Sequence, residues 1–446
     1  MFLYYNNISI NKKERRKIMN YIKKSVKSGI NVHLIKTSKF KTNLFSIFLT
    51  VPLQKETVTK NALIASVLRR GTAQMPTQEE ISKNLEEMYG ASFDCGIDKT
   101  GDNHVIKFYL ECINDEFLPG NDKIAKKCFD ILLSIAFNPT TRNGHFLQEY
   151  VETEKENLKQ IIEGKIDNKR SYASERCIEE MYKNQPYGLY KFGYVEDLNN
   201  IDAKGLYEYY QDLIKTAKID IFVSGNLADD TINMINSDEL LQNLNEREPN
   251  YIINKNEIKS KSFREDVNAN IVEEKLQVNQ GKLMLGLDVI TQTQDAPSKY
   301  ATSVYNIILG GSANSKLFQN VREKASLAYT AGSNYIRIKN NIIIKSGIEI
   351  KNYDKALEII KEQLEEIKQG KFTDEEVENA KKLIISTVGS ISDSQDSEIT
   401  YYLSQELSDE FVTIDEYIKN IEQVDKKQVI NVANSIKINT IYFLRN

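Results

Sequence analysis

The second half of this 446-residue chain repeats the pattern of the first half. Residues 89–135 and residues 327–367 both predict a strand with alternating apolar side chains, a polar turn, a second strand and an amphipathic helix. The next predicted helix is repeated as well, because residues 146–162 match residues 372–385 with several identical residues in register. A chain with such a repeat is expected to fold into two similar units.

Two aspartates mark a third correspondence between the halves. Asp202 precedes a predicted helix that leads into a strand at residues 219–224, and Asp425 precedes a helix that leads into a strand at residues 440–444. An aspartate at such a position accepts a hydrogen bond from a free backbone N–H group of the first helical turn. Three matched pairs in the same order predict a tandem duplication of an α+β domain.

The predicted strands and helices do not alternate regularly, as they would in parallel βαβ units. This order favours a mostly antiparallel sheet in each domain, with helices packed on one face. The boundary is expected in a polar, lysine-rich stretch that contains Pro249 and has little apolar periodicity. We therefore predict an N-terminal domain at residues 1–242, a linker at residues 243–265 and a C-terminal domain at residues 266–446.

Charge and hydropathy exclude two classes of partner. Lys and Arg number 59 against 63 Asp and Glu, and this nearly neutral balance provides no basic surface for nucleic acid. The longest apolar runs, residues 44–53 and 131–137, are far shorter than the roughly 20 residues that span a bilayer. They indicate buried strands or core helices, and no membrane partner is expected.

The N-terminal sequence and the cysteines predict a cytoplasmic protein. The first residues, MFLYYNNISINKKERRK, contain no apolar stretch of the kind found in signal peptides, and Met19 is an alternative translation start. The cysteines show no C-x-x-C spacing, which favours reduced, structural thiols. They are Cys95, Cys112, Cys128 and Cys177.

Residues 61–72, NALIASVLRRGT, resemble the zinc-binding helix of the insulinase/pitrilysin (inverzincin) peptidase family. In that family the helix carries H-x-x-E-H followed after a few residues by Gly-Thr, and its histidines bind zinc while its glutamate polarises water. Counted back from the Gly-Thr pair, these positions fall on Ala62, Ala65 and Ser66. None of these side chains can bind zinc usefully or abstract a proton at neutral pH.

The resemblance places a third zinc ligand, a glutamate, on the helix predicted at residues 151–162. The family pattern E-x-E fits Glu152 and Glu154, and the ligand position seven residues further falls on Ile161. The glutamates of this helix are otherwise interpreted as a solvated face. The three histidines, none of them four residues from another, are interpreted as surface or hydrogen-bonded residues: His33, His104 and His145. We therefore expect no metal, no other cofactor and no catalysis.

Residues 307–335 resemble the signature of the family's second domain. The pair at residues 310–311, Gly-Gly, predicts a turn, and Ser315 is expected to cap a short helix at residues 316–325. The helix then gives way to a strand, which would bring Arg322 and Tyr329 to a common edge. In the family, an Arg and a Tyr at this spacing contact the substrate backbone beside the zinc.

The chemistry of Arg322 and Tyr329 agrees with that role, because guanidinium and phenol groups donate hydrogen bonds to a peptide carbonyl or a developing oxyanion. The structural alternative is a solvated helix-end cation and an ordinary strand aromatic. One departure from the family pattern is Ser326, where the family usually has glycine at the end of the helix.

Two functions follow from the resemblance. The first is a non-catalytic subunit that supplies Arg322 and Tyr329 to a zinc-bearing partner with an intact H-x-x-E-H motif, in a heterodimeric peptidase. The second is a scaffold, paired with itself as a clamshell, that holds a peptide by β-augmentation without cleaving it. An independent enzyme of another class has no support, because the chain contains no phosphate loop, G-x-S-x-G or dinucleotide motif. Within the family, the resemblance is nearest to the non-catalytic bacterial members associated with 5-aminopentanol modification of elongation factor P.

Overall fold

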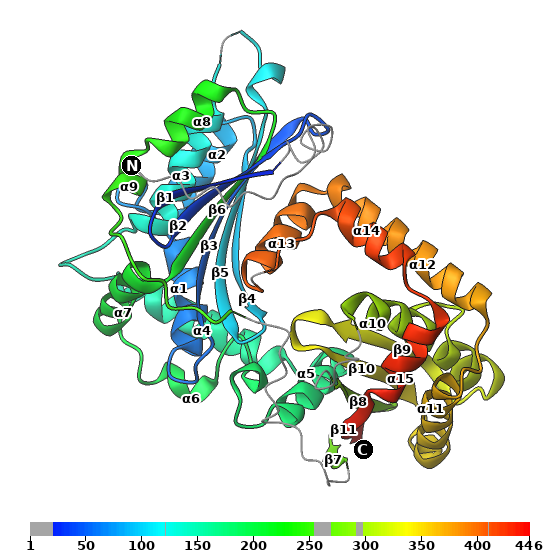
Figure 1. Ribbon diagram of the computed structural model, residues 1–446. Coiled ribbons are helices and arrows are strands. Elements are labelled where there is room, and N and C mark those ends of the chain that lie inside the picture. The colour runs from blue at the N-terminus through cyan, green and yellow to red at the C-terminus, as the bar shows by residue number, and fades with distance from the viewer. Residues whose placement is uncertain (1–20, 121, 254–268, 291–297, 409) are drawn as a thin grey trace.

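The structure is a computed structural model that describes residues 21–120, 122–253, 269–290, 298–408 and 410–446. Two β-sheets, one in each half of the chain, form the centre of two helix-covered layers (Figure 1). The alternative start at Met19 lies outside the described residues, as do residues 254–265 of the predicted linker. None of the helices in the described ranges has the length and apolar composition needed to cross a membrane.

The first sheet has six strands in the order β1-β2-β6-β3-β5-β4. Its neighbours are antiparallel except for β2 and β6, which are parallel. The central strand β3 is almost fully buried, as its continuous apolar run predicts. The strands are β1 Tyr21–Lys27, β2 Ile30–Lys36, β3 Thr42–Pro52, β4 Ser92–Thr100, β5 Asn103–Ile113 and β6 Lys218–Gly225.

The second sheet has five strands in the order β7-β11-β8-β10-β9 and follows the same plan. Its neighbours are again antiparallel except for one parallel pair, β7 and β11. The two sheets end at equivalent edge strands, β4 and β9, each the first strand of a repeated hairpin. The strands are β7 Asn270–Lys275, β8 Gly281–Val289, β9 Ala328–Ile336, β10 Asn341–Ile348 and β11 Ile436–Arg445.

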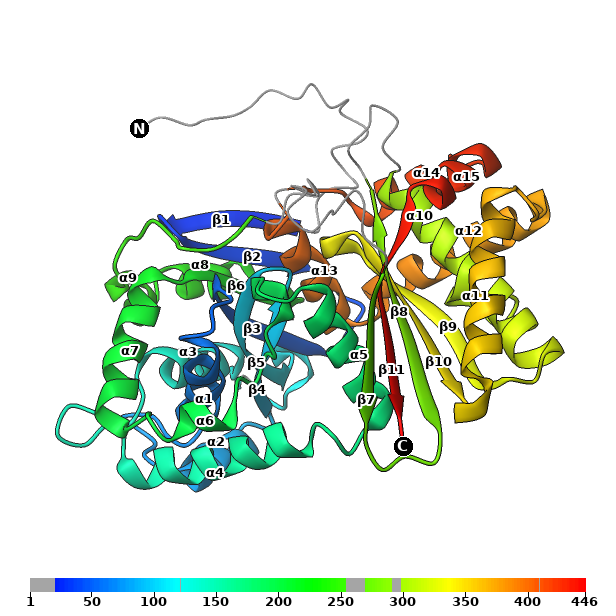
Figure 2. The same ribbon diagram turned by 90° about the horizontal axis from the view of Figure 1, so that it is seen from below.

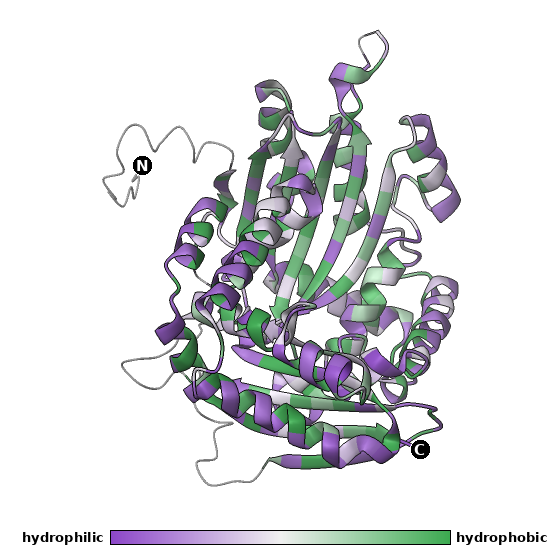
Figure 3. Cartoon of the chain, turned by 90° about the vertical axis from the view of Figure 1, so that its right-hand side faces the viewer, coloured by the Kyte–Doolittle hydropathy of each residue, from purple (hydrophilic) through white to green (hydrophobic). Residues whose placement is uncertain are grey.

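Helices cover one face of each sheet, and their apolar sides form two large cores with the strands. Figure 3 shows the resulting pattern, with hydrophobic strands between helices whose outer faces are hydrophilic. This arrangement confirms the α+β class. The first half contains α1 Val58–Leu68, α2 Gln78–Glu87, α3 Ala125–Phe137, α4 Gln148–Gly164, α5 Lys169–Met181, α6 Val195–Leu198, α7 Ala203–Thr216, α8 Asp229–Asn236 and α9 Glu239–Asn243. The second contains α10 Lys299–Asn306, α11 Tyr353–Lys368, α12 Asp374–Gly389, α13 Gln395–Glu406, α14 Ile414–Glu422 and α15 Lys426–Asn434.

The two predicted N-cap aspartates are confirmed. The Asp202 side chain accepts a hydrogen bond from the backbone N–H of Gly205 at 2.7 Å, at the start of α7. The Asp425 side chain accepts one from the backbone N–H of Gln428 at 2.8 Å, at the start of α15. Each helix leads directly into a strand that belongs to the parallel pair of its sheet, α7 into β6 and α15 into β11, so the two segments have the same local arrangement.

The other face of each sheet is covered by a helix from the opposite half of the chain. Helix α5 packs on β8 and β11 of the second sheet, and α13 packs on β6 of the first sheet (Figures 1 and 2). Each contact forms a smaller apolar core of its own. The sequence predicted the helices that cover one face of each sheet. It did not predict that α5 and α13 each cover the other face of the sheet in the opposite half.

Candidate functional site

Helix α1 carries the three positions where the family resemblance places zinc chemistry. Ala62 and Ala65 are buried and Ser66 is half-buried. These positions share one side of the helix, because residues three and four apart lie together. The thiol of Cys95 on β4 contacts the carbonyl oxygen of Ala65 at 3.2 Å, so the edge strand packs against α1 at this point. Two methyl groups and one hydroxyl provide no ligand set for a zinc ion.

The fourth position, Ile161, lies on α4, which packs against α1. Its aliphatic side chain is 46% exposed and has no atom that could coordinate a metal. Within the described ranges, no three His, Cys, Asp or Glu side chains are grouped so that they could hold a metal ion. The donor set at these four positions therefore does not fit zinc, and no metal-dependent step is assigned to this chain.

An ion pair joins α1 and α4 beside the substituted positions. Arg70, just beyond the end of α1, contacts the carboxylate of Glu154 through its Nε and Nη2 atoms. The side-chain amide of Asn157 donates to the other carboxylate oxygen at 3.2 Å. Glu154 is only 5% exposed, so its interpretation as part of a solvated face is wrong, although Glu152 and Glu156 are exposed.

The position of Glu154 in the helix explains this difference. It lies three residues after Val151 and four before Leu158, and both of these side chains are buried. Helical periodicity therefore placed Glu154 on the core side of α4, and this signal was available in the sequence. A carboxylate on that side needs a cation, and Arg70 provides it.

Two of the three histidines are buried and hydrogen-bonded, as predicted. The hydroxyl of Tyr21 lies 2.7 Å from Nδ1 of His33, and Nε2 of His33 lies 2.9 Å from the Asp220 carboxylate. Burial alone would raise the pKa of Asp220, but the charge of Lys218 and the hydrogen bond from His33 hold it well below its usual range. This buried network lies under α13, where Glu406 approaches Lys218 at 3.9 Å.

His104 is a buried, neutral histidine with both ring nitrogens occupied. The hydroxyl of Tyr209 donates to Oδ1 of Asn61 at 2.8 Å, which turns the amide N–H of Asn61 towards Nδ1 of His104 at 3.2 Å. Nε2 of His104 donates to the carbonyl of Lys191 at 2.9 Å. Burial lowers the pKa of His104 to about 4, although the bond to the Lys191 carbonyl opposes the shift.

This environment makes stability depend on pH. The unfolded chain binds a proton at His104 near the ordinary pKa of 6.5. The contribution of the neutral His104 to stability is therefore fully present above pH 6.5 and is lost as the pH falls towards 4. The loss attributable to this residue is on the order of 3 kcal/mol at pH 4. Urea unfolding at pH 7 and pH 4.5 should show a smaller pH effect in His104→Gln than in wild type. The control His145→Gln should retain the wild-type pH effect, and an equal effect in all three proteins would contradict the assignment.

Arg322 and Tyr329 are both exposed, where a helical segment gives way to the edge strand β9. Arg322 belongs to the π-helical segment Phe318–Lys324 and its side chain is 43% exposed. Its guanidinium lies over the ring of Phe318, 4.6 Å from the centroid, and 3.5 Å from Glu323. Tyr329 is 66% exposed on β9, whose outer edge has no strand partner in the described part of the chain. Both donor groups are therefore available to a molecule lying along this edge.

The segment before Arg322 differs from its predicted form. Gly310 and Gly311 do not form a turn with positive φ, because they end a π-helical segment, Ile307–Gly311. A Cβ atom at Gly310 would lie 2.4 Å from the backbone nitrogen of Ser333, so close packing against β9 requires glycine there. Ser315 does not cap the next helix through its side chain, since its buried Oγ has no hydrogen-bond partner in the structure.

Ser326, which departs from the family pattern, has a backbone conformation that favours glycine. Its φ of 52° lies in the left-handed region, which glycine adopts without strain and most other residues avoid. The backbone N–H of Ser326 donates to the carbonyl of Arg322 at 3.1 Å and closes the helix end. The chain therefore retains the helix-to-strand geometry of the motif although the glycine is absent.

Comparison with known proteins identifies the family. The chain is 35% identical over 431 residues to a protein of Bacillus subtilis (strain 168) described as a probable inactive metalloprotease, YmfF, and the match covers 96% of this chain and 99% of that protein. This chain belongs to the M16 family of insulinase-like peptidases. Residues 200–384 match the family model for the peptidase M16 inactive domain.

Two further comparisons extend the match. A conserved protein of Enterococcus faecalis V583 has a crystal structure that superposes with a TM-score of 0.84, at 28% identity, over 96% of this chain and 99% of that chain. An uncharacterized zinc protease of Bacillus subtilis (strain 168), YmxG, is 23% identical over 326 residues, covering 71% of this chain and 73% of that protein. Together with the substituted metal positions, the match to the inactive domain makes this chain a non-catalytic M16 homologue.

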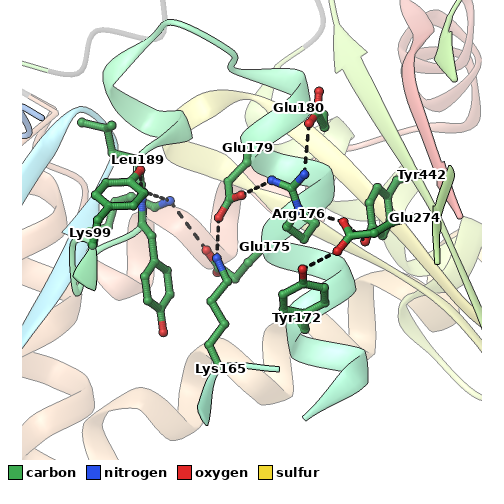
Figure 4. A network of polar contacts seen from close by, with 12 residues as sticks. Lys99, Lys165, Tyr172, Glu175, Arg176, Glu179, Glu180, Leu189, Glu274 and Tyr442 are labelled. Atoms are coloured by element: carbon green, nitrogen blue, oxygen red, sulfur yellow. Dashed lines mark hydrogen bonds and ion pairs between the residues drawn. The ribbon is translucent and has the colours of Figure 1, made fainter. Parts of the chain in front are cut away.

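A polar network around α5 joins the two halves of this M16 homologue (Figure 4). Nε of Arg176 donates to Glu274 on β7 at 3.0 Å, and the hydroxyl of Tyr442 on β11 donates to the same carboxylate at 2.9 Å. Arg176 also pairs with Glu179, three residues further along α5, and Lys165 donates to the same carboxylate at 2.8 Å. Local sequence patterns do not predict this network, because Arg176 and Glu274 lie 98 residues apart.

Proposed function

We propose that this chain is the non-catalytic subunit of a heterodimeric zinc metallopeptidase and supplies Arg322 and Tyr329 to the active site of its partner. The observation that supports this most directly is the contrast between the two sites. The metal positions Ala62, Ala65 and Ser66 cannot bind zinc, whereas Arg322 and Tyr329 remain exposed beside a free strand edge.

The exposure of Tyr329 argues against a purely structural role. Tyr335, on the same strand, packs against the core of the second half, and its hydroxyl donates to Asn340 at 2.8 Å. Tyr329 has no such environment, and burying an aromatic ring usually stabilises a protein. A tyrosine left in solvent at the edge of a sheet is therefore available for a bound peptide, whose backbone carbonyls accept hydrogen bonds.

The partner we propose is a second M16 protein with an intact H-x-x-E-H helix. The two Bacillus subtilis relatives support this pairing of types, since one is described as inactive and the other as a zinc protease. The substrate is a peptide. The location in the cytoplasm stays a prediction of the N-terminal sequence and the cysteines, and the association with modification of elongation factor P stays a prediction of the resemblance.

Co-purification from the native cell tests the proposal. We expect the chain, isolated through an affinity tag, to bring with it an M16 protein that carries H-x-x-E-H, identified by mass spectrometry. Zinc and chelator-sensitive peptide cleavage should be present in the complex and absent from the chain alone. Recovery of the chain without such a partner, or zinc-dependent cleavage by the chain alone, would contradict the proposal.

A scaffold that binds peptides without cleavage is the second candidate. The observation in its favour is that both sheets end at an edge strand, β4 and β9, with backbone groups available for β-augmentation. Gel filtration with light scattering distinguishes the candidates. A stable homodimer with no zinc-bearing partner in the co-purification would favour the scaffold.

A further inference from the structure

Four basic side chains gather on the face of the second sheet that α5 covers. Lys345 on β10 pairs in register with Met284 on β8, and Lys282 lies two residues before Met284 on the same strand. Alternate residues of a strand share a face, so both lysines lie on the face where Met284 packs under α5. They are diagonal neighbours across the two strands, within reach of one ligand.

The other two cations come from the first turn of α5. Lys169 and Arg170 open this helix, and its first turn contains no acidic residue. Positive side chains are unfavourable there, because the helix dipole already places partial positive charge at the N-terminus. Arg170 lies close enough to both Lys282 and Lys345 to lower the pKa of each, although burial makes the larger contribution. We refer to Lys169, Arg170, Lys282 and Lys345 as the basic cluster.

The described contacts leave the positive charge of the cluster largely uncompensated. Lys282 donates to the neutral amide oxygen of Gln280, and Lys169 donates to the backbone carbonyl of Ile166 at 2.8 Å. Among the contacts of the described residues, Lys345 and Arg170 form no hydrogen bond or ion pair.

One carboxylate, Glu175 on α5, acts electrostatically on Lys345 and raises its pKa, against the effect of burial and Arg170. Glu175 also lies 3.9 Å from the amine of Lys99, and Figure 4 shows this contact on the side of α5 that faces the first half. A single carboxylate shared with Lys99 cannot balance four cations. Lys169, Lys282 and Lys345 are half-buried and Arg170 is exposed, so the cluster retains a positive field at a place that is partly shielded from solvent but open to a ligand.

A cavity adjoins the cluster. It has a volume of about 460 Å³ and is lined by Lys169, Lys282 and residues 277–280, which contribute amide and apolar side chains and no carboxylate. Ammonium groups and side-chain amides donate hydrogen bonds, so this lining suits an anion.

We propose that the basic cluster binds the carboxylates of an acidic peptide segment. The inference rests on the proposed function and adds a substrate class to it. Gly332 on the edge strand β9 pairs with Lys345 on β10. A peptide added to the outer edge of β9 would therefore be separated from Lys345 by this single strand. A free phosphate offers the same oxyanion chemistry, and competition with inorganic phosphate distinguishes it from the carboxylates of a peptide.

Binding to the full-length chain tests the proposal, because the entire cluster lies within this chain. The probes are a fluorescein-labelled oligo-glutamate peptide and its oligo-glutamine counterpart, measured by fluorescence anisotropy at low salt. We expect the glutamate peptide to bind roughly tenfold more tightly, as charge-assisted hydrogen bonds allow. Lys345→Met and Lys282→Met should each remove most of this preference and leave the affinity for the glutamine peptide unchanged.

Two controls separate binding from folding. Lys351→Met removes an exposed lysine that pairs with Glu349 in the same half, and it should leave both affinities unchanged. The melting temperature of Lys345→Met should equal or exceed that of wild type, because a half-buried charge without an ion pair opposes folding. A structural role would instead lower the melting temperature.

Each alternative outcome is decisive. Equal affinities for the two peptides, unaffected by the substitutions, would overturn the inference while leaving peptide binding and the proposed function in place. Failure of both peptides to bind the full-length chain would overturn the inference, and the co-purification experiment would then decide the proposed function separately. Displacement of the glutamate peptide by inorganic phosphate at equal or lower concentration would overturn the peptide assignment and identify the ligand as free phosphate.

Discussion

Replacement of Arg70 by alanine should destabilise the chain by about 3–5 kcal/mol, the range observed when one partner of a buried ion pair is removed. Glu154 would remain on the core side of α4 with only the amide of Asn157 as a donor. Urea unfolding followed by circular dichroism measures the change. The matched control is Arg69→Ala, which removes the neighbouring cation and should have an effect below about 1 kcal/mol.

The double replacement Arg70→Met and Glu154→Leu distinguishes a stranded charge from a general loss of packing. If the penalty arises from the unpaired carboxylate, the apolar pair should restore stability to within about 1 kcal/mol of wild type or exceed it. Equal destabilisation of the single and double variants would show that the contact stabilises the chain through side-chain packing and not through its charges. The resemblance implies that zinc joins these two helices in active relatives, so the ion pair would maintain the same contact without a metal.

In the complex with a zinc-bearing partner, Arg322→Ala and Tyr329→Phe should each reduce peptide turnover while the subunits stay assembled. A donor that meets charge developing on the scissile carbonyl acts mainly in the transition state, so its loss should lower kcat by roughly 10²–10³-fold. If the two groups instead hold the peptide backbone equally in the ground and transition states, KM should rise with little change in kcat.

Lys324→Ala provides the matched control for these kinetics. Lys324 lies in the same helical segment as Arg322 and bonds to Asn320 at 3.1 Å, so its removal tests a general loss of positive charge. It should leave kcat and KM unchanged. Wild-type kinetics for both Arg322→Ala and Tyr329→Phe, in a complex shown by gel filtration to be assembled, would exclude the lending of these groups and favour the scaffold.

Local patterns in the sequence were sufficient to predict most of the helices and strands discussed above. Strand alternation predicted the two hairpins, β4–β5 and β9–β10, and Asp202 and Asp425 lie at the caps where they were predicted. These features depend on neighbours a few residues away, which the sequence displays directly. The spacing to the Gly-Thr pair likewise predicted that Ala62, Ala65 and Ser66 lie on one helix, and α1 contains all three residues.

Features that depend on contacts between distant segments were missed or misread. The amphipathic pattern of α5 shows that one face is apolar, but it does not specify which sheet that face covers, and α5 packs on the sheet of the other half. Helical spacing puts Glu154 on the core side of α4, but the sequence does not show that Arg70, 84 residues away, is the cation that pairs with it. The sequence around Gly310 predicts a turn, whereas in the structure the glycine is required by close packing against β9.

The sequence by itself determined that this chain has two α+β units with a zinc helix that has lost its ligands, because periodicity and motif spacing are properties of the chain alone. Only the tertiary structure decided which charges meet. The exchange of α5 and α13, the Arg70–Glu154 pair and the basic cluster all arise when strands and helices far apart in sequence are packed together. The physical reason is that burial creates the need for a partner, and which partner is within reach depends on the packing of the whole chain.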